Sequence, residues 1–463
     1  MKIYNTLTRS FEEFKPLKDS EVLFYHCGPT VYWVQHIGNL RAMTWADLIR
    51  RSFKFLDYRV KFVRNYTDVG HLTSDEDEGE DKMEKGAKRE GKSPQEIADK
   101  YISIFEKDTR DLNIIDPDFK PRASEYVKEM QEMIGKLIED GYAYVTDLAV
   151  VYDVSKFPDY NKLNHQKMDL NVKGAGRGVV DDPQKKHFAD FNLWVFKKGA
   201  HQNALQTWDS PWGEGFPGWH IECSVMAKSL LGETIDIHMG GVEHIPVHHT
   251  NEIAQSEAAN GKPFVKYWLH NEHLNVDSAK MAKSQGTGFT LKEIVDRGFD
   301  PSDLRYFFLG AHYRSKQNFT FDALKGAATG LCNLKEAVAD LKKNTEKVPS
   351  VDKNNEYYKR FVESLNNDFE IPQALAVLWE LIKSKTPPAE KLSLALDFDR
   401  VLGLNLIESK TVEIPEEIDI LCQERLDAKK SGDYDKADQL RDEIRKRGFE
   451  VEDFKDGYRI KKG

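Results

Sequence analysis

The chain has 463 residues, and at about 150 residues per domain this length predicts about three structural units. Hydrophobic residues make up 40% of the sequence and charged residues 31%, a globular composition that excludes a disordered chain and a fibre. The net charge of −10 argues against a protein that coats nucleic acid indiscriminately, although local basic patches are compatible with it.

The sequence also limits the cellular locations that we expect for the protein. It contains no run of about 18 apolar residues, and residues 1–6 lack the apolar stretch of a signal peptide. Its four cysteines, Cys27, Cys223, Cys332 and Cys422, are too few for a disulfide scaffold in a chain of this length. We therefore expect no membrane contact, a cytoplasmic location and reduced thiols, with Cys332 and Cys422 serving only as small buried hydrophobic side chains.

The first part of the chain predicts a strand, a helix and a second strand. Residues 21–27 are a short apolar run that ends at a Gly-Pro turn, residues 39–58 carry apolar side chains at helical spacing, and residues 59–65 form another apolar run. Such a unit is typical of a parallel sheet. The acidic run 74–81 that follows is more simply a solvated loop than a cation site.

The middle of the chain changes character at about residue 142. We interpret residues 142–199 as an insertion in the sheet domain, and their Gly- and Lys-rich stretch at 173–178 as a flexible loop rather than a phosphate cradle. The other elements expected in this part are helices over 94–112, 124–140 and 247–259 and strands over 149–153 and 235–238.

The last third predicts mainly helices. Apolar spacing indicates helical structure from residue 319 to about 404, with a break at Pro387-Pro388, and residues 411–415 form a linker. The terminal unit is expected to hold helices over 418–430 and 434–447 and a β tail over 449–460.

His36 is the first candidate for chemistry. It follows a predicted strand and stands where a helix begins, and a helix N-terminus attracts phosphate through its free N–H groups. Gly38 would let a nucleotide approach the backbone, and an imidazole can donate to a phosphoryl oxygen as charge develops. Alone, a histidine in this position is more often a helix cap or a packed residue.

Lys280 and Lys283 form a second candidate, in the string Lys280-Met281-Ala282-Lys283-Ser284. Two lysines on a loop can neutralise a triphosphate as pyrophosphate leaves, although lysine-rich loops are usually just solvated. Together with the segment around His36, in this order and at this separation, the string resembles the two signatures of class I aminoacyl-tRNA synthetases.

A set of potential metal ligands is the third candidate. Cys27 ends the first predicted strand, Cys223 lies in the segment 218–224, and His248 and Glu252 are four residues apart on one face of a predicted helix. Two thiolates, one imidazole and one carboxylate suit Zn²⁺. Spacing alone leaves His249 as an alternative to His248, and each cysteine could instead be a buried hydrophobic residue.

At this point the resemblance becomes specific, because several motifs are similar to those of the cysteinyl-tRNA synthetase family. They are Cys27-Gly28-Pro29-Thr30-Val31-Tyr32 leading to His36-Ile37-Gly38-Asn39, Trp208–Gly213, Pro217–Ser224, His248–Ser256 and Lys280–Ser284. The match covers nearly the whole chain. It implies a ligase that activates L-cysteine with ATP and Mg²⁺, releases pyrophosphate and transfers cysteine to tRNA-Cys.

The resemblance assigns roles to residues. It implies one zinc ion per chain on Cys27, Cys223, His248 and Glu252, which would select the substrate thiolate over serine. It implies catalytic roles for His36, Asn39, Lys280 and Lys283, ATP binding by His36, Gly38, Gly241, Glu243 and Lys283, and a substrate pocket that includes Thr67, Asp68, Trp219 and His220.

The resemblance also implies an α/β fold. A Rossmann-type parallel-sheet catalytic domain with an insertion would be followed by a helical bundle and a small mixed anticodon-binding unit. The expected domains are the first catalytic half 1–112, the connective insertion 113–205, the second half 206–270, the lysine-loop and stem-contact region 271–320, the helical bundle 321–410 and the anticodon-binding unit 411–463. We expect a monomer.

Some residues depart from the family pattern. Asn39 replaces the second histidine of the class signature, as is usual in the family, and Ala282 replaces a common serine. Glu243 stands where the family usually has Asp. Ile460 stands where the family tends to have a Trp that faces the anticodon, and Tyr458 could supply the stacking surface instead.

Two other functions compete with this interpretation. A ligase that joins cysteine to an amino sugar shares the catalytic part but lacks a full anticodon-binding end, and the other alternative is a non-catalytic zinc-stabilised RNA-binding protein. The intact His36, Lys280 and Lys283 argue against the second. A cluster of cations in the terminal unit favours tRNA: Arg425, Lys429, Lys430, Arg441, Arg445, Lys446 and Arg447.

Overall fold

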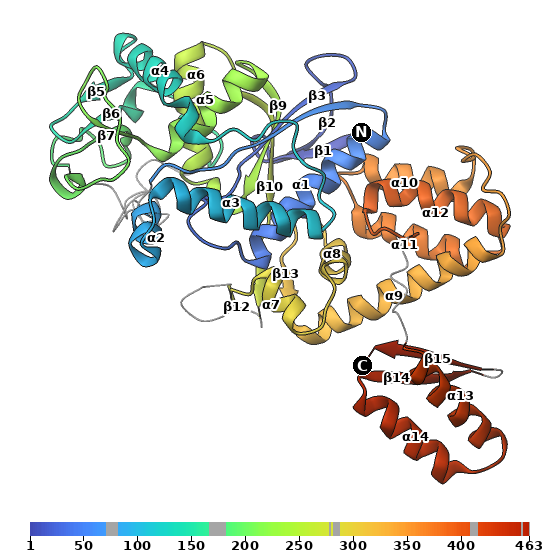
Figure 1. Ribbon diagram of the computed structural model, residues 1–463. Coiled ribbons are helices and arrows are strands. Elements are labelled where there is room, and N and C mark those ends of the chain that lie inside the picture. The colour runs from blue at the N-terminus through green and yellow to red at the C-terminus, as the bar shows by residue number, and fades with distance from the viewer. Residues whose placement is uncertain are drawn as a thin grey trace. The chain divides into compact units, whose positions relative to one another are not determined.

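The computed structural model describes residues 1–70, 82–165, 182–276, 279–280, 288–407, 415–454 and 457–462. The chain forms two compact units, unit 1 (Met1–Asn405) and unit 2 (Leu406–Gly463) (Figure 1). No helix in the described ranges is long and apolar enough to cross a membrane. The predicted loops at 74–81 and 173–178 and the predicted linker up to residue 414 lie outside the described residues.

Unit 1 is built on a parallel four-stranded sheet in the order β10-β9-β3-β4. Its strands are β3 (Glu21–His26), β4 (Arg59–Arg64), β9 (Ile235–Gly241) and β10 (Val265–Asn271). Helix α1 (Ile37–Phe55) connects β3 to β4, which confirms the predicted strand–helix–strand unit and the α/β fold class. β9 is buried along its whole length, as expected where helices cover both faces of a parallel sheet.

One face of β3 packs against helices, and a short hairpin lies beside the edge strand β10. Leu23, Tyr25 and Cys27 alternate along the strand and share one hydrophobic cluster with residues of α5 (Trp219–Leu231) and α6 (His248–Asn260). The hairpin of β1 (Lys2–Asn5) and β2 (Ser10–Glu13) lies beside β10, where Asn5 Nδ2 donates to Lys266 O at 2.9 Å. The core of unit 1 therefore forms around the sheet, with the cysteine-bearing face toward α5 and α6.

The insertion between β4 and β9 carries its own antiparallel sheet, in the order β5-β6-β7-β8. Its elements are α2 (Lys82–Glu90), α3 (Pro94–Asp111), α4 (Val127–Glu139), β5 (Ala143–Val145), β6 (Ala149–Tyr152), β7 (Phe191–Phe196) and β8 (Gly215–Pro217). Helix α3 begins with a capping box in which Ser93 and Glu96 satisfy each other's backbone N–H groups, which explains its sharp start.

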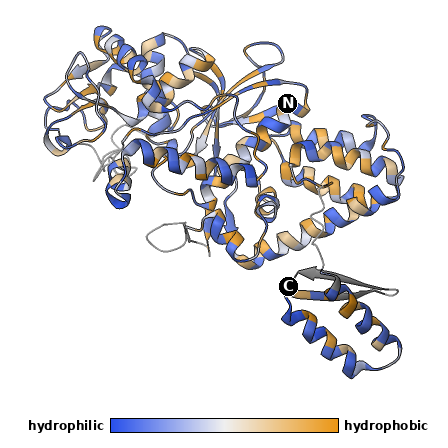
Figure 2. Cartoon of the chain, in the orientation of Figure 1, coloured by the Kyte–Doolittle hydropathy of each residue, from blue (hydrophilic) through white to orange (hydrophobic). Residues whose placement is uncertain are grey.

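A small three-stranded sheet and a set of helices complete unit 1. The sheet has the order β12-β11-β13, with β11 (Leu274–Val276), β12 (Ala279–Lys280) and β13 (Gln317–Phe319). The helices are α7 (Leu291–Asp296), α8 (Pro301–Leu309), α9 (Phe321–Lys343), α10 (Glu356–Asn366), α11 (Ile371–Lys383) and α12 (Pro388–Leu402). The predicted helical region and its break before Pro388 are confirmed, and Figure 2 shows apolar residues along α10–α12.

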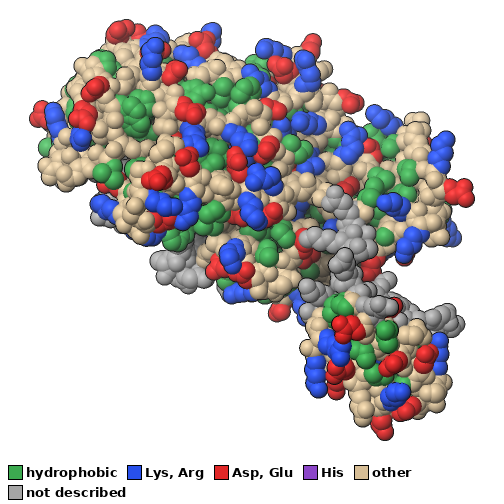
Figure 3. All heavy atoms as spheres, in the orientation of Figure 1, with side chains coloured by type: hydrophobic (Ala, Val, Ile, Leu, Met, Phe, Trp, Pro, Cys, Tyr) green, Lys and Arg blue, Asp and Glu red, His purple; other side chains and the backbone are tan. Residues whose placement is uncertain are grey.

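Unit 2 consists of two helices and a hairpin, as predicted. They are α13 (Glu416–Lys430), α14 (Tyr434–Lys446), β14 (Phe449–Phe454) and β15 (Gly457–Lys462), and the two strands pair antiparallel. Four buried residues form its core, with Phe449 packed against them: Ile418, Cys422, Ile444 and Val451. Figure 3 shows cationic and anionic side chains interspersed on the visible surface. One sequence expectation fails here, because Arg425 is only 2% exposed and so cannot serve as a surface cation.

Candidate active site and metal centre

The candidate site lies at the carboxyl ends of β3 and β9, the two central strands. The chain goes from β3 to β4 on one side and later adds β9 and β10 on the other, and open α/β sheets bind ligands at such a reversal of strand order. Gly28 lies two residues after the end of β3, and a Cβ there would lie 1.6 Å from Asn65 O. Only glycine therefore lets the chain turn so close to the end of β4.

Four predicted metal ligands meet at this point. One potential ligand atom from each of Cys27, Cys223, His248 and Glu252 lies within 4.8 Å of those of the other three, and all four residues are buried. The two sulfurs are 3.9 Å apart, and His248 Nε2 is 2.9 Å from Glu252 Oε1. They come from the end of β3, from α5 and from one face of α6, so that residues distant in sequence converge.

The donor set fits a zinc ion. Sulfur, nitrogen and carboxylate oxygen at these separations are the ligands of four-coordinate zinc sites. Glu252 is fully buried, and both of its oxygens face imidazoles: Oε1 lies 2.9 Å from His248 Nε2 and Oε2 lies 2.8 Å from His238 Nε2. Buried charges in proteins are paired or coordinate metals, and a bound cation would compensate the charge of this carboxylate.

The structure also brings the alternative histidine to the same place. His249 Nε2 is 3.4 Å from Cys27 Sγ, and its Nδ1 is 2.8 Å from His270 Nε2. Cys27, His238, His249 and Glu252 therefore form a second candidate ligand group that overlaps the first. The choice between His248 and His249 that spacing left open stays open on geometry alone.

The surroundings of the cluster lower the pKa values of two of the four ligand residues, Glu252 and Cys223, and raise those of the other two. Burial alone would raise the pKa of Glu252, but His238 and His248 outweigh it and lower the pKa to about 2. The hydrogen bond with Cys27 lowers the pKa of Cys223 to about 7, while burial raises that of Cys27. Burial would lower the pKa of His248, but Glu252 and Cys223 raise it to about 10. Metal binding must therefore displace protons from His248 and Cys27.

The residues predicted for the substrate pocket divide into two groups. Trp219 stacks on His248 with ring centroids 4.3 Å apart, and His220 Nδ1 is 2.9 Å from His248 Nδ1. Thr67 is buried and donates to Glu222 Oε2 at 3.0 Å. Asp68 is fully buried, and both of its oxygens accept hydrogen bonds from Ser124, at 2.9 and 2.6 Å.

The residues predicted to meet the nucleotide lie at α1 and after β9. His36 is the N-cap of α1, and its Nδ1 accepts from Asn39 N at 3.2 Å, so the capping role considered for this histidine is real. Gly38 is in the first turn of the helix. Gly241 ends β9, and a Cβ there would lie 2.3 Å from the carboxylate oxygens of Glu243, whose side chain is 45% exposed.

Of the two signature lysines, the structure describes the backbone of Lys280 but not Lys283. Lys280 belongs to β12, which pairs antiparallel with β11. Lys283 lies outside the described residues.

Sequence reasoning missed several residues that surround the cluster. Tyr25 is buried beside Cys223 and Cys27, and His238 and Glu222 contact Glu252 and Thr67. Alternation along β3 would have placed Tyr25 on the face of Cys27. Contacts of His238 and Glu222 depend on tertiary packing and left no pattern in the sequence. The expectation for Cys422 is confirmed by its burial, but that for Cys332 is wrong, because Cys332 is exposed on α9.

Comparisons with known proteins cover nearly the whole chain. Residues 13–329 match the class I (C) tRNA synthetase catalytic domain, and residues 411–459 match the cysteinyl-tRNA ligase anticodon binding domain. The cysteine–tRNA ligase of Treponema denticola is 41% identical over 98% of each chain, and cysteine–tRNA ligase 1 of Burkholderia lata is 42% identical over 99% of this chain and 96% of its own. A Mycobacterium tuberculosis methionyl-tRNA synthetase, solved with methionyl-adenylate, shares the fold with a TM-score of 0.56 at 14% identity, over 83% of this chain and 90% of its own.

Proposed function

The chain belongs to the cysteine–tRNA ligase family of class I aminoacyl-tRNA synthetases, and we propose that it activates L-cysteine with ATP and transfers it to the 3′ end of tRNA-Cys. The observation that carries the proposal is the convergence of Cys27, Cys223, His248 and Glu252 at the strand-order reversal of a nucleotide-binding type of sheet.

Cys27, Cys223, His248 and Glu252 would hold one zinc ion. This set is favoured over the one with His249 because it uses both Cys27 and Cys223. Bound zinc would supply a thiophilic Lewis acid that favours the thiolate of cysteine over the hydroxyl of serine. The protein orients two of the ligands through their other atoms, since His220 lies at His248 Nδ1 and His238 at Glu252 Oε2.

The first step joins cysteine to AMP. A carboxylate oxygen of cysteine attacks the α-phosphorus of ATP, and the bond to the leaving pyrophosphate breaks. The N-terminal turn of α1 would offer the partial positive charge of the helix to the phosphates, and His36 stands at its start. Lys280 and Lys283, with the Mg²⁺ of the nucleotide, would neutralise the charge that builds up on pyrophosphate.

The substrate is held by residues around the cluster. Trp219, stacked on His248, would form a wall of the pocket and exclude water from it. Thr67 is tied to Glu222, so this carboxylate is a further candidate for the substrate ammonium group. Asp68 instead fixes the position of Ser124 by accepting hydrogen bonds from its backbone N–H and its hydroxyl.

The second step transfers cysteine to tRNA. A hydroxyl of the terminal ribose attacks the carbonyl carbon of the adenylate, and AMP leaves. Unit 2 would bind the anticodon end, which is supported by the match of residues 411–459 to an anticodon binding domain. The same match disfavours an amino-sugar acceptor, whose ligases lack a full anticodon-binding end.

Two assays test the proposal. Cysteine-dependent ATP–pyrophosphate exchange should be present and should fall when zinc is removed, while serine and alanine should support little exchange. A tRNA-Cys transcript should then accept cysteine. Absence of exchange would exclude an adenylate-forming enzyme, and exchange without charging would point to another acceptor.

A further inference from the structure

Arg41 is a buried cation on α1, one turn beyond the residues that the proposed function places at the nucleotide. It is 1% exposed, and within the described ranges it forms no ion pair with a carboxylate. Its donors meet neutral acceptors instead: Nε donates to Gln317 Oε1 at 2.9 Å, Nη1 to Glu272 O at 2.7 Å, and Nη2 to His312 O and Ser315 O at 3.0 Å each.

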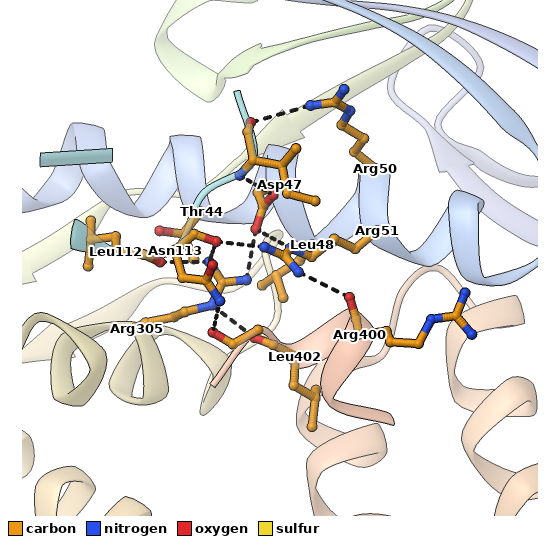
Figure 4. A network of polar contacts seen from close by, with 12 residues as sticks. Thr44, Asp47, Leu48, Arg50, Arg51, Leu112, Asn113, Arg305, Arg400 and Leu402 are labelled. Atoms are coloured by element: carbon orange, nitrogen blue, oxygen red, sulfur yellow. Dashed lines mark hydrogen bonds and ion pairs between the residues drawn. The ribbon is translucent and has the colours of Figure 1, made fainter. Parts of the chain in front are cut away.

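The charge of Arg41 is held by neutral oxygen acceptors instead of a carboxylate. Burial lowers the pKa of Arg41 to about 10, against the opposing charge of Glu272, so the side chain stays protonated at neutral pH. Arg305, another buried arginine near α1, shows the usual arrangement, in which its Nη2 contacts Asp47 Oδ2 at 2.8 Å (Figure 4). An apolar side chain in place of Arg41 would avoid desolvating a cation, but it would leave four oxygen acceptors without this donor, so the position serves to connect those acceptors to α1.

The acceptors of Arg41 belong to the base of the segment that carries the signature lysines. Gln317 begins β13, and its Nε2 donates to Phe307 O at 2.6 Å, which fixes its oxygen toward Arg41. β13 pairs with β11, and β11 pairs with β12, which contains Lys280. One of the four hydrogen bonds of Arg41 therefore ends on β13, and the other three end on residues that lead into β11 and β13, namely Glu272, His312 and Ser315.

The lysine segment also returns to α1 at its other end. Ile37 N donates to Phe289 O at 2.8 Å, and His36 pairs with Thr290 in an isolated antiparallel bridge. Lys280 is thus connected to the N-terminal half of α1 through β11, and Phe289 is bonded to it directly.

We propose that Arg41 is a positioning residue that holds β11 and β13, and through β11 the strand of Lys280, in register with the N-terminal turn of α1, so that His36 and Lys280 act on the same triphosphate. This inference rests on the proposed function. The lysines are needed while pyrophosphate leaves, and the transfer to tRNA follows that departure. Loss of the register should therefore slow adenylate formation and spare transfer.

The test compares Arg41→Met with Arg50→Met in the full chain. Arg50 lies on the same helix and is 2% exposed, but its donors go to Ile115 O, Asp116 O and Asp118 Oδ1. Misplaced groups cost about 10- to 100-fold, so Arg41→Met should slow single-turnover adenylate formation by about that factor. Transfer from preformed adenylate and the KM for cysteine should change by less than about twofold, and Arg41→Lys should recover part of the rate.

Two further measurements keep the inference testable if Arg41→Met folds poorly. Gln317→Met removes one acceptor, and it should slow adenylate formation less than Arg41→Met and not additively with Arg41→Lys. Amide hydrogen exchange of the protein without substrates should show lost protection in β11, β13 and at Ile37 in the Arg41 variants but not in Arg50→Met.

The inference is overturned if adenylate formation and transfer slow equally, if Arg50→Met slows adenylate formation as much as Arg41→Met, or if protection at β11 and β13 is unchanged. If the wild-type chain shows no cysteine-dependent exchange at all, the proposed function fails, and hydrogen exchange still decides whether Arg41 holds the two segments together.

Discussion

The metal-ligand cluster of unit 1 and the surface of unit 2 differ in how their side chains are held. In the cluster, Cys27, Cys223, His248 and Glu252 are buried, and their partners include other buried side chains such as His238 and His220. In unit 2, a core of four residues supports helices whose cations are largely exposed, among them Lys430, Arg441, Arg445 and Lys446.

This difference teaches what each region can do. Selecting a thiolate requires ligand atoms fixed by packing and by further hydrogen bonds. Phosphate contacts tolerate long, mobile side chains because charge attraction depends weakly on exact geometry. Changes in the cluster should therefore have large effects on the amino-acid steps, and changes in unit 2 should have effects confined to tRNA.

Cys223→Ser should have the largest effect. It removes a sulfur ligand from a buried site, so zinc content should fall and discrimination between cysteine and serine should fall by about 10⁴-fold, the factor by which a matched polar site rejects the wrong analogue. Metal analysis and exchange kinetics with both amino acids measure this. Cys332→Ser, at the exposed cysteine, is the matched control. Full zinc content together with intact selectivity in Cys223→Ser would show that the assignment is wrong.

Lys283→Ala should slow adenylate formation by about two to three orders of magnitude, because one preorganised charge at a developing anion is worth about 3–4 kcal/mol. The affinity for cysteine should hardly change, and Lys280→Ala should behave similarly but more weakly. Single-turnover rates that stay at the wild-type value would remove Lys283 from the mechanism.

The affinity for zinc should rise with pH. The raised pKa values of His248, about 10, and of Cys27 keep protons on both residues in the metal-free protein at neutral pH. Zinc must displace them, so its affinity should increase by about 10- to 100-fold per pH unit above pH 7. Titration against a competing chelator at several pH values measures the slope. A flat profile would mean that the ligands already lack protons.

Much of the site was predictable because its residues stand in recognisable motifs. Cys27, Cys223 and Glu252 were candidates from residue type and helical spacing, which left His248 and His249 open until the resemblance in the motifs favoured His248. One strand–helix–strand pattern predicted the parallel pair of β3 and β4, but no pattern predicted β10 or the order of the sheet. What remained hidden depends on tertiary packing.

Arg41 and His238 illustrate that limit. The partners of Arg41 lie about 230 to 280 residues downstream, so no local sequence pattern predicts these contacts. His238 is one histidine in an ordinary strand until α6 brings Glu252 against it. The buried Arg425 and the exposed Cys332 were misjudged for the same reason, since residue type alone does not determine burial.

Removal of unit 2 should separate the two regions. A chain that ends after Asn405, the last residue of unit 1, should keep cysteine-dependent exchange because the cluster and α1 lie wholly in unit 1. It should lose most of its charging efficiency and its discrimination against tRNA with a changed anticodon. Equal charging of both tRNAs by the truncated and full chains would give unit 2 another role.

Tyr458→Ala should have the smallest effect. Tyr458 lies in β15. Ile460 stands where the family tends to have a Trp, and the ring of Tyr458 is our candidate for the stacking surface that this Trp would give an unpaired base. Stacking on an aromatic ring is worth about 1–3 kcal/mol per base, so the KM for tRNA should rise about tenfold while exchange stays unchanged. Tyr458→Phe should restore the KM because the ring remains.

Tyr434→Ala is the control, since this tyrosine is 65% exposed on α14 of the same unit and can be removed without loss of packing. If Tyr434→Ala raises the KM and Tyr458→Ala does not, the bases stack at the start of α14 instead of on the hairpin. Unit 2 would then bind RNA through its helices, and the contrast with the rigid cluster would be sharper still.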